Sequence, residues 1–215
     1  MNIERINILI DKYLVDYVYN AARIEGVNTK YLDTKLLVED GIEPNLDSDK
    51  IIILKNLKDA YKSFKDIDFL NQDIDLYSLK RTNLIINGRG LVHEAGQIRI
   101  DEVYISNCSY VSPIPDEYTV NNSIIDIISQ NKDKLDIGID LYLYIMRSQP
   151  FIDGNKRTAN VFANLYLLKN DCPIISVHAD KKKQFLSLLS RFYETNDSSK
   201  IREFILKNGI YNIHQ

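Results

Sequence analysis

Cysteine and histidine are both scarce in this sequence of 215 residues. Cys108 and Cys172 are the only cysteines, and two isolated cysteines form neither a disulfide framework nor a zinc motif, so we expect packing thiols. The three histidines, His93, His178 and His214, share no metal-ligand spacing. A histidine-rich metal site is therefore not expected.

Glycine, proline and long hydrophobic runs are also limited. The 8 glycines and 5 prolines are too few for a collagen-like chain, and a 45% hydrophobic content is too high for a disordered one. The longest aliphatic run covers residues 51–54, whereas a membrane span needs about 20 apolar residues. Glu4, Asp11 and Asp16 interrupt the first twenty residues, which is atypical of a signal peptide. We therefore expect a cytoplasmic protein without membrane contact.

An excess of positive charge is absent, since the formal net charge is -3. Nucleic acid is therefore not an expected partner, although a local basic patch would be compatible with this value. The most basic run, residues 181–183, is three consecutive lysines. We interpret it as a solvated helix face, with phosphate binding or target docking as the alternative.

The apolar spacing predicts a mainly α-helical chain. The segment 134–148 alternates like a strand, but the positions between are apolar too, and its length favours a buried helix. A length of 215 residues fits one large domain, which we place over 1–215, with an N-terminal helical segment at 1–47 and a core at 48–210. Helices are predicted at about 6–22, 29–41, 48–64, 74–87, 117–131, 134–148, 155–170, 179–194 and 198–207.

The helical pattern is interrupted between residues 88 and 111. Glycines are frequent there, and Gln97, Ile98, Arg99 and Ile100 alternate between polar and apolar. This alternation is typical of a strand. We therefore expect a small β-hairpin or flap in this segment.

The segment 148–160 carries the clearest chemical signal. Pro150 biases Gln149 away from helical angles, so the preceding helix should end there. Gly154 permits a tight turn with exposed backbone amides, and Asn155 is a suitable N-cap for the next helix. A helix N-terminus with free amides favours anions.

Lys156 and Arg157 place two cations in that first turn, where the helix dipole disfavours them unless an anion is bound. Asp153 adds a hard oxygen donor that can hold Mg²⁺ against phosphate. Together these residues describe a magnesium–nucleotide site. The alternative is a solvated loop between two helices. A P-loop is excluded, because its glycine–lysine pattern is absent.

This segment resembles the signature of the Fic family, His-Pro-Phe-x-Asp/Glu-Gly-Asn-Gly/Lys-Arg. Residues 96–105 are similar to the family's flap, and the likeness covers about residues 50–208. The resemblance implies a Fido-type helical bundle with one small β-hairpin flap. The matching positions are Pro150, Phe151, Asp153, Gly154, Asn155, Lys156 and Arg157.

Fic proteins typically transfer AMP from ATP to a Ser, Thr or Tyr hydroxyl of a target protein, and Doc-like members transfer a phosphoryl group. By resemblance, Asp153 would hold Mg²⁺, and Gly154, Asn155, Lys156 and Arg157 would bind phosphates, with Arg157 also acting in catalysis. The flap residues Gln97, Ile98, Arg99 and Ile100 would dock the target as an added strand. Self-modification and a homo-oligomer both stay open.

Two positions depart from the family signature. Gln149 stands where the family has its histidine base, and a carboxamide can orient a hydroxyl but cannot take its proton. Asn160 stands where a second arginine would bind the γ-phosphate. His93 is a candidate substitute base. The sequence therefore leaves two functions open: a transferase with an unusual base, and a nucleotide-binding pseudoenzyme that regulates or binds partners.

Glu25 and Gly26 resemble the end of the inhibitory helix that some Fic proteins carry, Ser/Thr-x-x-x-Glu-Gly/Asn. Ala21 departs from its first position. The resemblance implies that Glu25 blocks the γ-phosphate position. Since Asn160 cannot pair with a carboxylate as an arginine would, any such contact would have to use Arg157. The alternative is a solvent-facing Glu before a helix-ending glycine.

Overall fold

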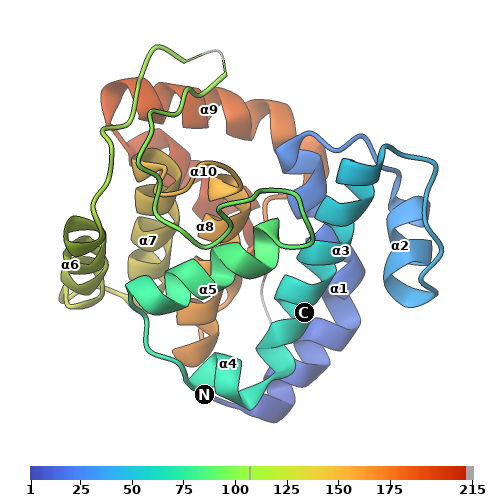
Figure 1. Cartoon of the computed structure of the whole chain (residues 1–215). Helices are drawn as coiled ribbons and strands as arrows, with labels where there is room; N and C mark the ends of the chain where they lie inside the picture. Colours follow the sequence, from blue (N-terminus) through green and yellow to red (C-terminus); the bar gives the residue numbers. More distant parts are fainter. Residues whose placement is uncertain (107, 212–215) are drawn as a thin grey trace.

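The computed structural model describes residues 1–106 and 108–211, and it is mainly α-helical (Figure 1). Helices α2 and α6 lie at opposite edges of the molecule in this view (Figure 1). The helices are α1 (Ile3–Glu25), α2 (Tyr31–Glu39), α3 (Ser48–Lys62), α4 (Ile67–Asn71), α5 (Leu76–Asn87), α6 (Glu117–Ile128), α7 (Lys134–Ser148), α8 (Asn155–Lys169), α9 (Lys182–Thr195) and α10 (Ser199–Asn208), with 3-10 turns η1 (Ser63–Lys65) and η2 (Ala179–Lys181).

The predicted helices are confirmed to within a few residues at each end. The segment 134–148 is the buried helix α7, as its length suggested. Helix α4 was not predicted, because five residues give too short a pattern to show a period. The predicted mainly α fold is therefore confirmed, and a small β element is present, but it lies outside the segment 88–111 where a hairpin was predicted.

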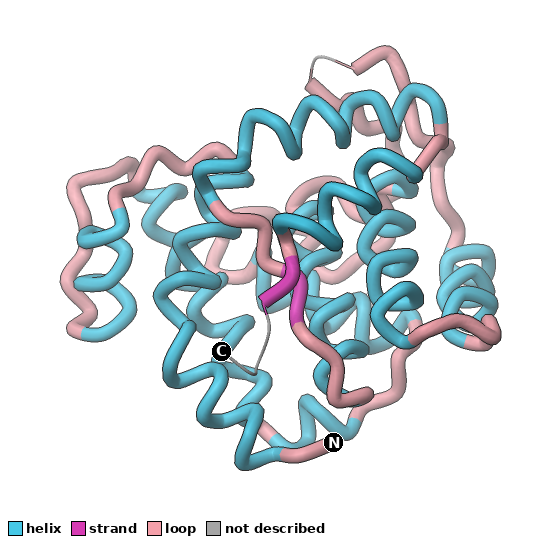
Figure 2. The backbone as a smooth tube through the Cα atoms, turned by 180° about the vertical axis from the view of Figure 1, so that it is seen from behind, coloured by secondary structure: helices cyan, strands magenta, loops and turns pink. Residues whose placement is uncertain are grey.

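The small β element is an antiparallel pair formed by β1 (Ile174–Ile175) and β2 (Ile210–Tyr211), drawn in magenta in Figure 2. Ile174 pairs with Tyr211, and Ile175 pairs with Ile210. In the described part of 88–111, the only β pairing is one isolated bridge between Tyr104 and Val111. The flap is thus an extended loop rather than a regular hairpin.

Helix α8 is the centre of the core, and nearly all of its residues are buried. Helix α7 packs closely along it, since Gly138 leaves room for the side chain of Leu167. Helices α1, α3 and α5 surround α8. Within the described ranges, none of these helices is long and apolar enough to cross a lipid bilayer.

Candidate functional site

The candidate site is the turn between α7 and α8. Helix α7 ends at Ser148, as the proline after Gln149 predicted, and Gln149 itself adopts a left-handed φ of 46°. The N-cap of α8 is Gly154, with φ 72° and no side-chain cap. The expectation that Asn155 caps this helix is therefore wrong, because Asn155 is already its first residue.

Asn155 instead shapes the turn from within. Its side-chain oxygen accepts a hydrogen bond from Phe151 N at 3.0 Å, and its Nδ2 donates to Phe151 O at 2.8 Å. The same Nδ2 donates to Gln149 Oε1 at 3.0 Å. These bonds leave the amides at the start of α8 without a side-chain cap, so they can face an anion.

Two asparagines of α5 hold the other side of the turn. Asn87 Nδ2 donates to the carbonyl of Asp153 at 2.7 Å, and Asn83 Nδ2 donates to Thr158 Oγ1 at 3.0 Å. A Cβ on Gly154 would lie 2.6 Å from the Asn87 amide, so this position requires glycine for space as well as for its φ. Neither asparagine was predicted as a site residue from the sequence; their spacing of four residues on one helix face was the available signal.

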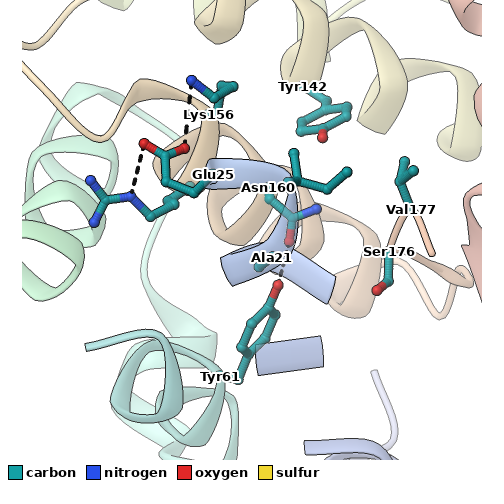
Figure 3. Close-up of a pocket in the computed structure, with 10 residues that line it drawn as sticks. Ala21, Glu25, Tyr61, Tyr142, Lys156, Asn160, Ser176 and Val177 are labelled. Atoms are coloured by element: carbon teal, nitrogen blue, oxygen red, sulfur yellow. Dashed lines mark hydrogen bonds and ion pairs between the residues drawn. The ribbon is translucent and has the colours of Figure 1, made fainter. Parts of the chain in front are cut away.

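Glu25, at the end of α1, lies over the cations of the turn (Figure 3). Its carboxylate is 3.5 Å from Lys156 Nζ and 3.6 Å from Arg157 Nε. The Glu25 side chain is 14% exposed and that of Arg157 only 2%. The structure therefore brings Glu25 to Arg157, and the solvent-facing alternative does not hold.

Asn160 points away from this ion cluster and is held in a polar network. Tyr61 donates to its Oδ1 at 2.6 Å, and Asn160 Nδ2 donates to Ile175 O at 2.9 Å. Asn164 donates both to Asn160 Oδ1 and to Ile175 O. Because both ends of the Asn160 amide are already bonded, this residue is poorly placed to bind a further ligand.

The carboxamide of Gln149 is also held at both ends. Its Nε2 donates to the carbonyl of Met146, and its Oε1 accepts from Asn155. An amide oxygen has two lone pairs, so one stays free to accept a hydrogen bond from a substrate hydroxyl.

A cavity of about 610 Å³ opens above the turn. The turn, Glu25 and Lys182 contribute charged and polar groups to its lining. Leu186 and Leu189 of α9 and Val103 and Ile105 of the flap contribute apolar side chains. A cavity of this size, lined by both charged and apolar groups, can hold a nucleotide.

Asp153 fits a magnesium site of the kind that uses one protein carboxylate and substrate phosphates. It lines the cavity, its side chain is 55% exposed, and only its Oδ2 is engaged, by Arg157 at 3.3 Å. Among the described residues, no group of three or more Asp, Glu, His or Cys side chains is placed to hold a metal ion by itself.

The flap residues divide between two roles. Ile100 is 83% exposed, Gln97 is exposed and Ile98 packs partly against the core. Arg99, expected to dock a target, is instead 4% exposed, and burial lowers its pKa. Its guanidinium donates to four carbonyls, those of Gln149, Asp101, Ser112 and Pro113. Arg99 therefore fixes the flap against the turn, and its assignment to target contact is corrected.

A second anchor joins the flap to the end of α9. Glu194 accepts hydrogen bonds from the Ser109 amide and hydroxyl, both at 2.6 Å, and from Cys108 Sγ at 3.2 Å. The bonds from Ser109, followed by that from Cys108, lower the pKa of Glu194. This anchor had no sequence signal, because its partners are 85 residues apart.

Of the remaining candidates, His93 and the lysines at 181–183, only one lines the cavity. His93 is exposed and is not among the residues that line the cavity, so the structure does not place it as a base. Of the three lysines at 181–183, Lys182 lines the cavity, whereas Lys181 and Lys183 are exposed.

Comparison with known proteins identifies a Fic/DOC family domain over residues 70–167. The protein adenylyltransferase fic-1 of Caenorhabditis elegans is 25% identical over 191 residues, and the Caenorhabditis briggsae protein of the same name is 22% identical. Each match covers 80% of this chain and 35% of the relative, so this chain spans about a third of their length.

Solved structures support the same fold. A Fic-1 structure from C. elegans superposes with a TM-score of 0.71 at 20% identity, covering 90% of this chain and 58% of the other. A Fic domain containing signaling protein from Bacteroides thetaiotaomicron gives a TM-score of 0.72 at 18% identity, covering 96% and 85%. At these identities the structural likeness establishes the fold alone.

Proposed function

Because the chain belongs to the Fic/DOC family, we propose that it binds ATP with Mg²⁺ at the 153–157 turn and transfers AMP to a hydroxyl of a target protein. The observation that carries this proposal is the cavity in which Asp153, Lys156 and the uncapped amides of α8 lie together with apolar side chains of α9 and the flap. The apolar groups suit a purine base, and the charged groups suit its phosphates.

In AMP transfer, the hydroxyl oxygen bonds to the α-phosphorus, the bond to the bridging oxygen of the β-phosphate breaks, and pyrophosphate leaves. Lys156, Arg157 and the first amides of α8 would balance the negative charge of the phosphates. Asp153 would hold Mg²⁺, which supplies further charge neutralisation when bound. Gln149 would orient the hydroxyl through its free lone pair, and the hydroxyl proton would pass to solvent.

We further propose that Glu25 inhibits this site. Its carboxylate occupies the position between Lys156 and Arg157 that a phosphate would need (Figure 3). ATP must displace this carboxylate. The apparent affinity for ATP is therefore the intrinsic affinity multiplied by the fraction of molecules in which the position is free.

A second function is favoured by one observation, the absence of a titratable base at Gln149. A positioned base contributes about 10²–10⁴-fold to rate. The alternative is therefore a pseudoenzyme that binds nucleotide and acts as a regulatory or interaction protein.

ATP labelled separately at the α- and γ-phosphates distinguishes these functions. The protein is incubated with lysate and Mg²⁺, as wild type and as Asp153→Ala. Protein label from α-labelled ATP that Asp153→Ala loses supports AMP transfer. Label from γ-labelled ATP alone indicates phosphoryl transfer and contradicts the proposal. Binding of Mg-ATP in calorimetry without any protein label supports the pseudoenzyme.

A further inference from the structure

Lys182 is a cation of the cavity for which neither the family signature nor the proposed function gives a role. It is the first residue of α9, a helix that packs against α1 (Figure 1). Its side chain is half-buried and lines the cavity together with Glu25 and Lys156. It makes no hydrogen bond or ion pair with any residue that the structure describes.

The charge around Lys182 is unbalanced. Burial and the nearby cations Arg23 and Lys156 lower its pKa, and Glu25 alone opposes them. Glu25 already neutralises Lys156 and Arg157. Glu25 and Asp153 therefore face four cations, Arg23, Lys156, Arg157 and Lys182, and this excess of positive charge favours the binding of an additional anion here.

The contacts of Glu25 are also incomplete. Both its ion pairs exceed 3.4 Å, and its Oε2 and the Nε of Arg157 are buried without a hydrogen-bond partner among the described residues. Leaving such groups without hydrogen bonds costs about 1–3 kcal/mol each, or more when charged. A ligand oxygen that accepted from Arg157 Nε would remove this cost, so the position occupied by Glu25 is suited to exchange for an anion.

The position of Glu25 also identifies which phosphate would bind there. Gln149, which would orient the hydroxyl in the proposed transfer, contacts the turn through Asn155, whereas Glu25 contacts Lys156 and Arg157. We therefore assign the Glu25 position to a phosphate other than the reacting one. Asn160 is hydrogen-bonded at both ends of its amide and contributes no charge to the site. The cation that α9 adds to the lining of the cavity is Lys182.

We propose that Lys182 binds the terminal phosphate of a nucleoside triphosphate once the Glu25 carboxylate leaves. The inference rests on the proposed function and specifies its substrate: the site recognises a triphosphate in preference to a diphosphate through a lysine on α9. Lys182 thereby supplies, from α9, the second cation that position 160 lacks.

Calorimetry with Mg-ATP and Mg-ADP tests this role in the full chain carrying Glu25→Gly. Lys182→Ala is expected to weaken ATP binding about tenfold and ADP binding less than about threefold, as for loss of one charge-assisted hydrogen bond to the third phosphate. Lys183→Ala is the matched control, because it removes the same charge from an exposed position one residue away. Lys182→Arg should retain most of the ATP affinity.

Equal ATP affinities for Lys182→Ala and Lys183→Ala would overturn the inference, as would equal losses for ATP and ADP. Arg157→Ala, measured in parallel, separates this failure from failure of the proposed function. If Arg157→Ala weakens ATP binding and Lys182→Ala does not, only the inference falls. If the Glu25→Gly protein binds no nucleotide, the proposed function falls as well. Thermal unfolding of each variant confirms that it is folded.

Discussion

At residue 149, the glutamine is positioned as firmly as a catalytic group would be. Both ends of its carboxamide are hydrogen-bonded, one to Met146 and one to Asn155. What the side chain lacks is a titratable nitrogen. The position therefore combines a fixed geometry with a missing proton acceptor.

Gln149→His should consequently raise protein modification by about 10², within the usual range for a positioned base. The rate should increase as pH rises through the imidazole pKa, about 6.5 when unperturbed, because the neutral ring is the active form. Mass spectrometry of target and self-modification at several pH values measures the effect. Absence of any modified residue in this variant would contradict a latent transferase.

Glu25 contacts the same turn from another element, α1. Glu25→Gly should raise the affinity for Mg-ATP about tenfold, because ATP no longer displaces a carboxylate from Lys156 and Arg157. Glu25→Gln is the matched control, since it keeps the shape of the side chain and removes only its charge. Calorimetry on both variants measures the change. Unchanged affinity in both would leave Glu25 a structural residue.

At the scale of elements, the flap is fixed by side chains rather than by strand pairing. Arg99 binds four carbonyls at one end, and Glu194 holds Ser109 at the other. This explains why an alternating pattern at 97–100 did not become a strand. Among the residues that the structure describes, no strand lies beside 97–100, and Arg99 uses its inward position for hydrogen bonds instead of packing.

The Glu194 anchor should depend on pH. Hydrogen bonds from Ser109 and then Cys108 lower the pKa of this carboxylate, so its stabilising effect is present above about pH 4.3, the ordinary value. That effect is lost as pH falls through the lowered folded-state pKa. Glu194→Gln should speed hydrogen exchange of the Ser109 amide about tenfold at neutral pH, measured by NMR. Equal exchange in both proteins would show that the anchor does not hold.

The helices could be predicted because their signals are local. Asp75 and Asp116, for example, each cap the start of the helix that follows them, and Gly26 ends α1 in a left-handed conformation. The phosphate-binding candidates at 153–157 were equally local. The supports of the site were not, since Asn87 and Tyr61 reach it from 66 and 99 residues away. Such contacts depend on packing that no short window contains.

At the scale of the whole molecule, Asn20 joins the first long helix to the last elements of the described chain. Its Nδ2 donates to Ser176 Oγ at 3.3 Å and to the Tyr211 hydroxyl at 3.4 Å, and its Oδ1 accepts from Ala179 N at 3.0 Å. The residue is 2% exposed. Its partners lie between 156 and 191 residues away in the sequence.

Asn20→Ala should lower the free energy of unfolding by about 2 kcal/mol, because it leaves the buried partners without hydrogen bonds. Urea denaturation followed by circular dichroism measures this change. Asn131→Ala, in an exposed loop, is the control and should change stability by less than about 0.5 kcal/mol. A loss no larger than that of the control would show that Asn20 does not hold these segments together.

The hydrogen bonds of Asn20 also determine when α1 can be fixed in place during synthesis. The ribosome makes α1 before the groups that Asn20 binds, which lie at 176–211. At about 5–20 residues per second, α1 waits on the order of ten seconds or more for these partners. The cations at 156 and 157 emerge before those partners do. A nascent chain therefore has the 153–157 turn before Asn20 can hold α1 in place, and the contact of Glu25 with this turn is secured only after the turn has been made.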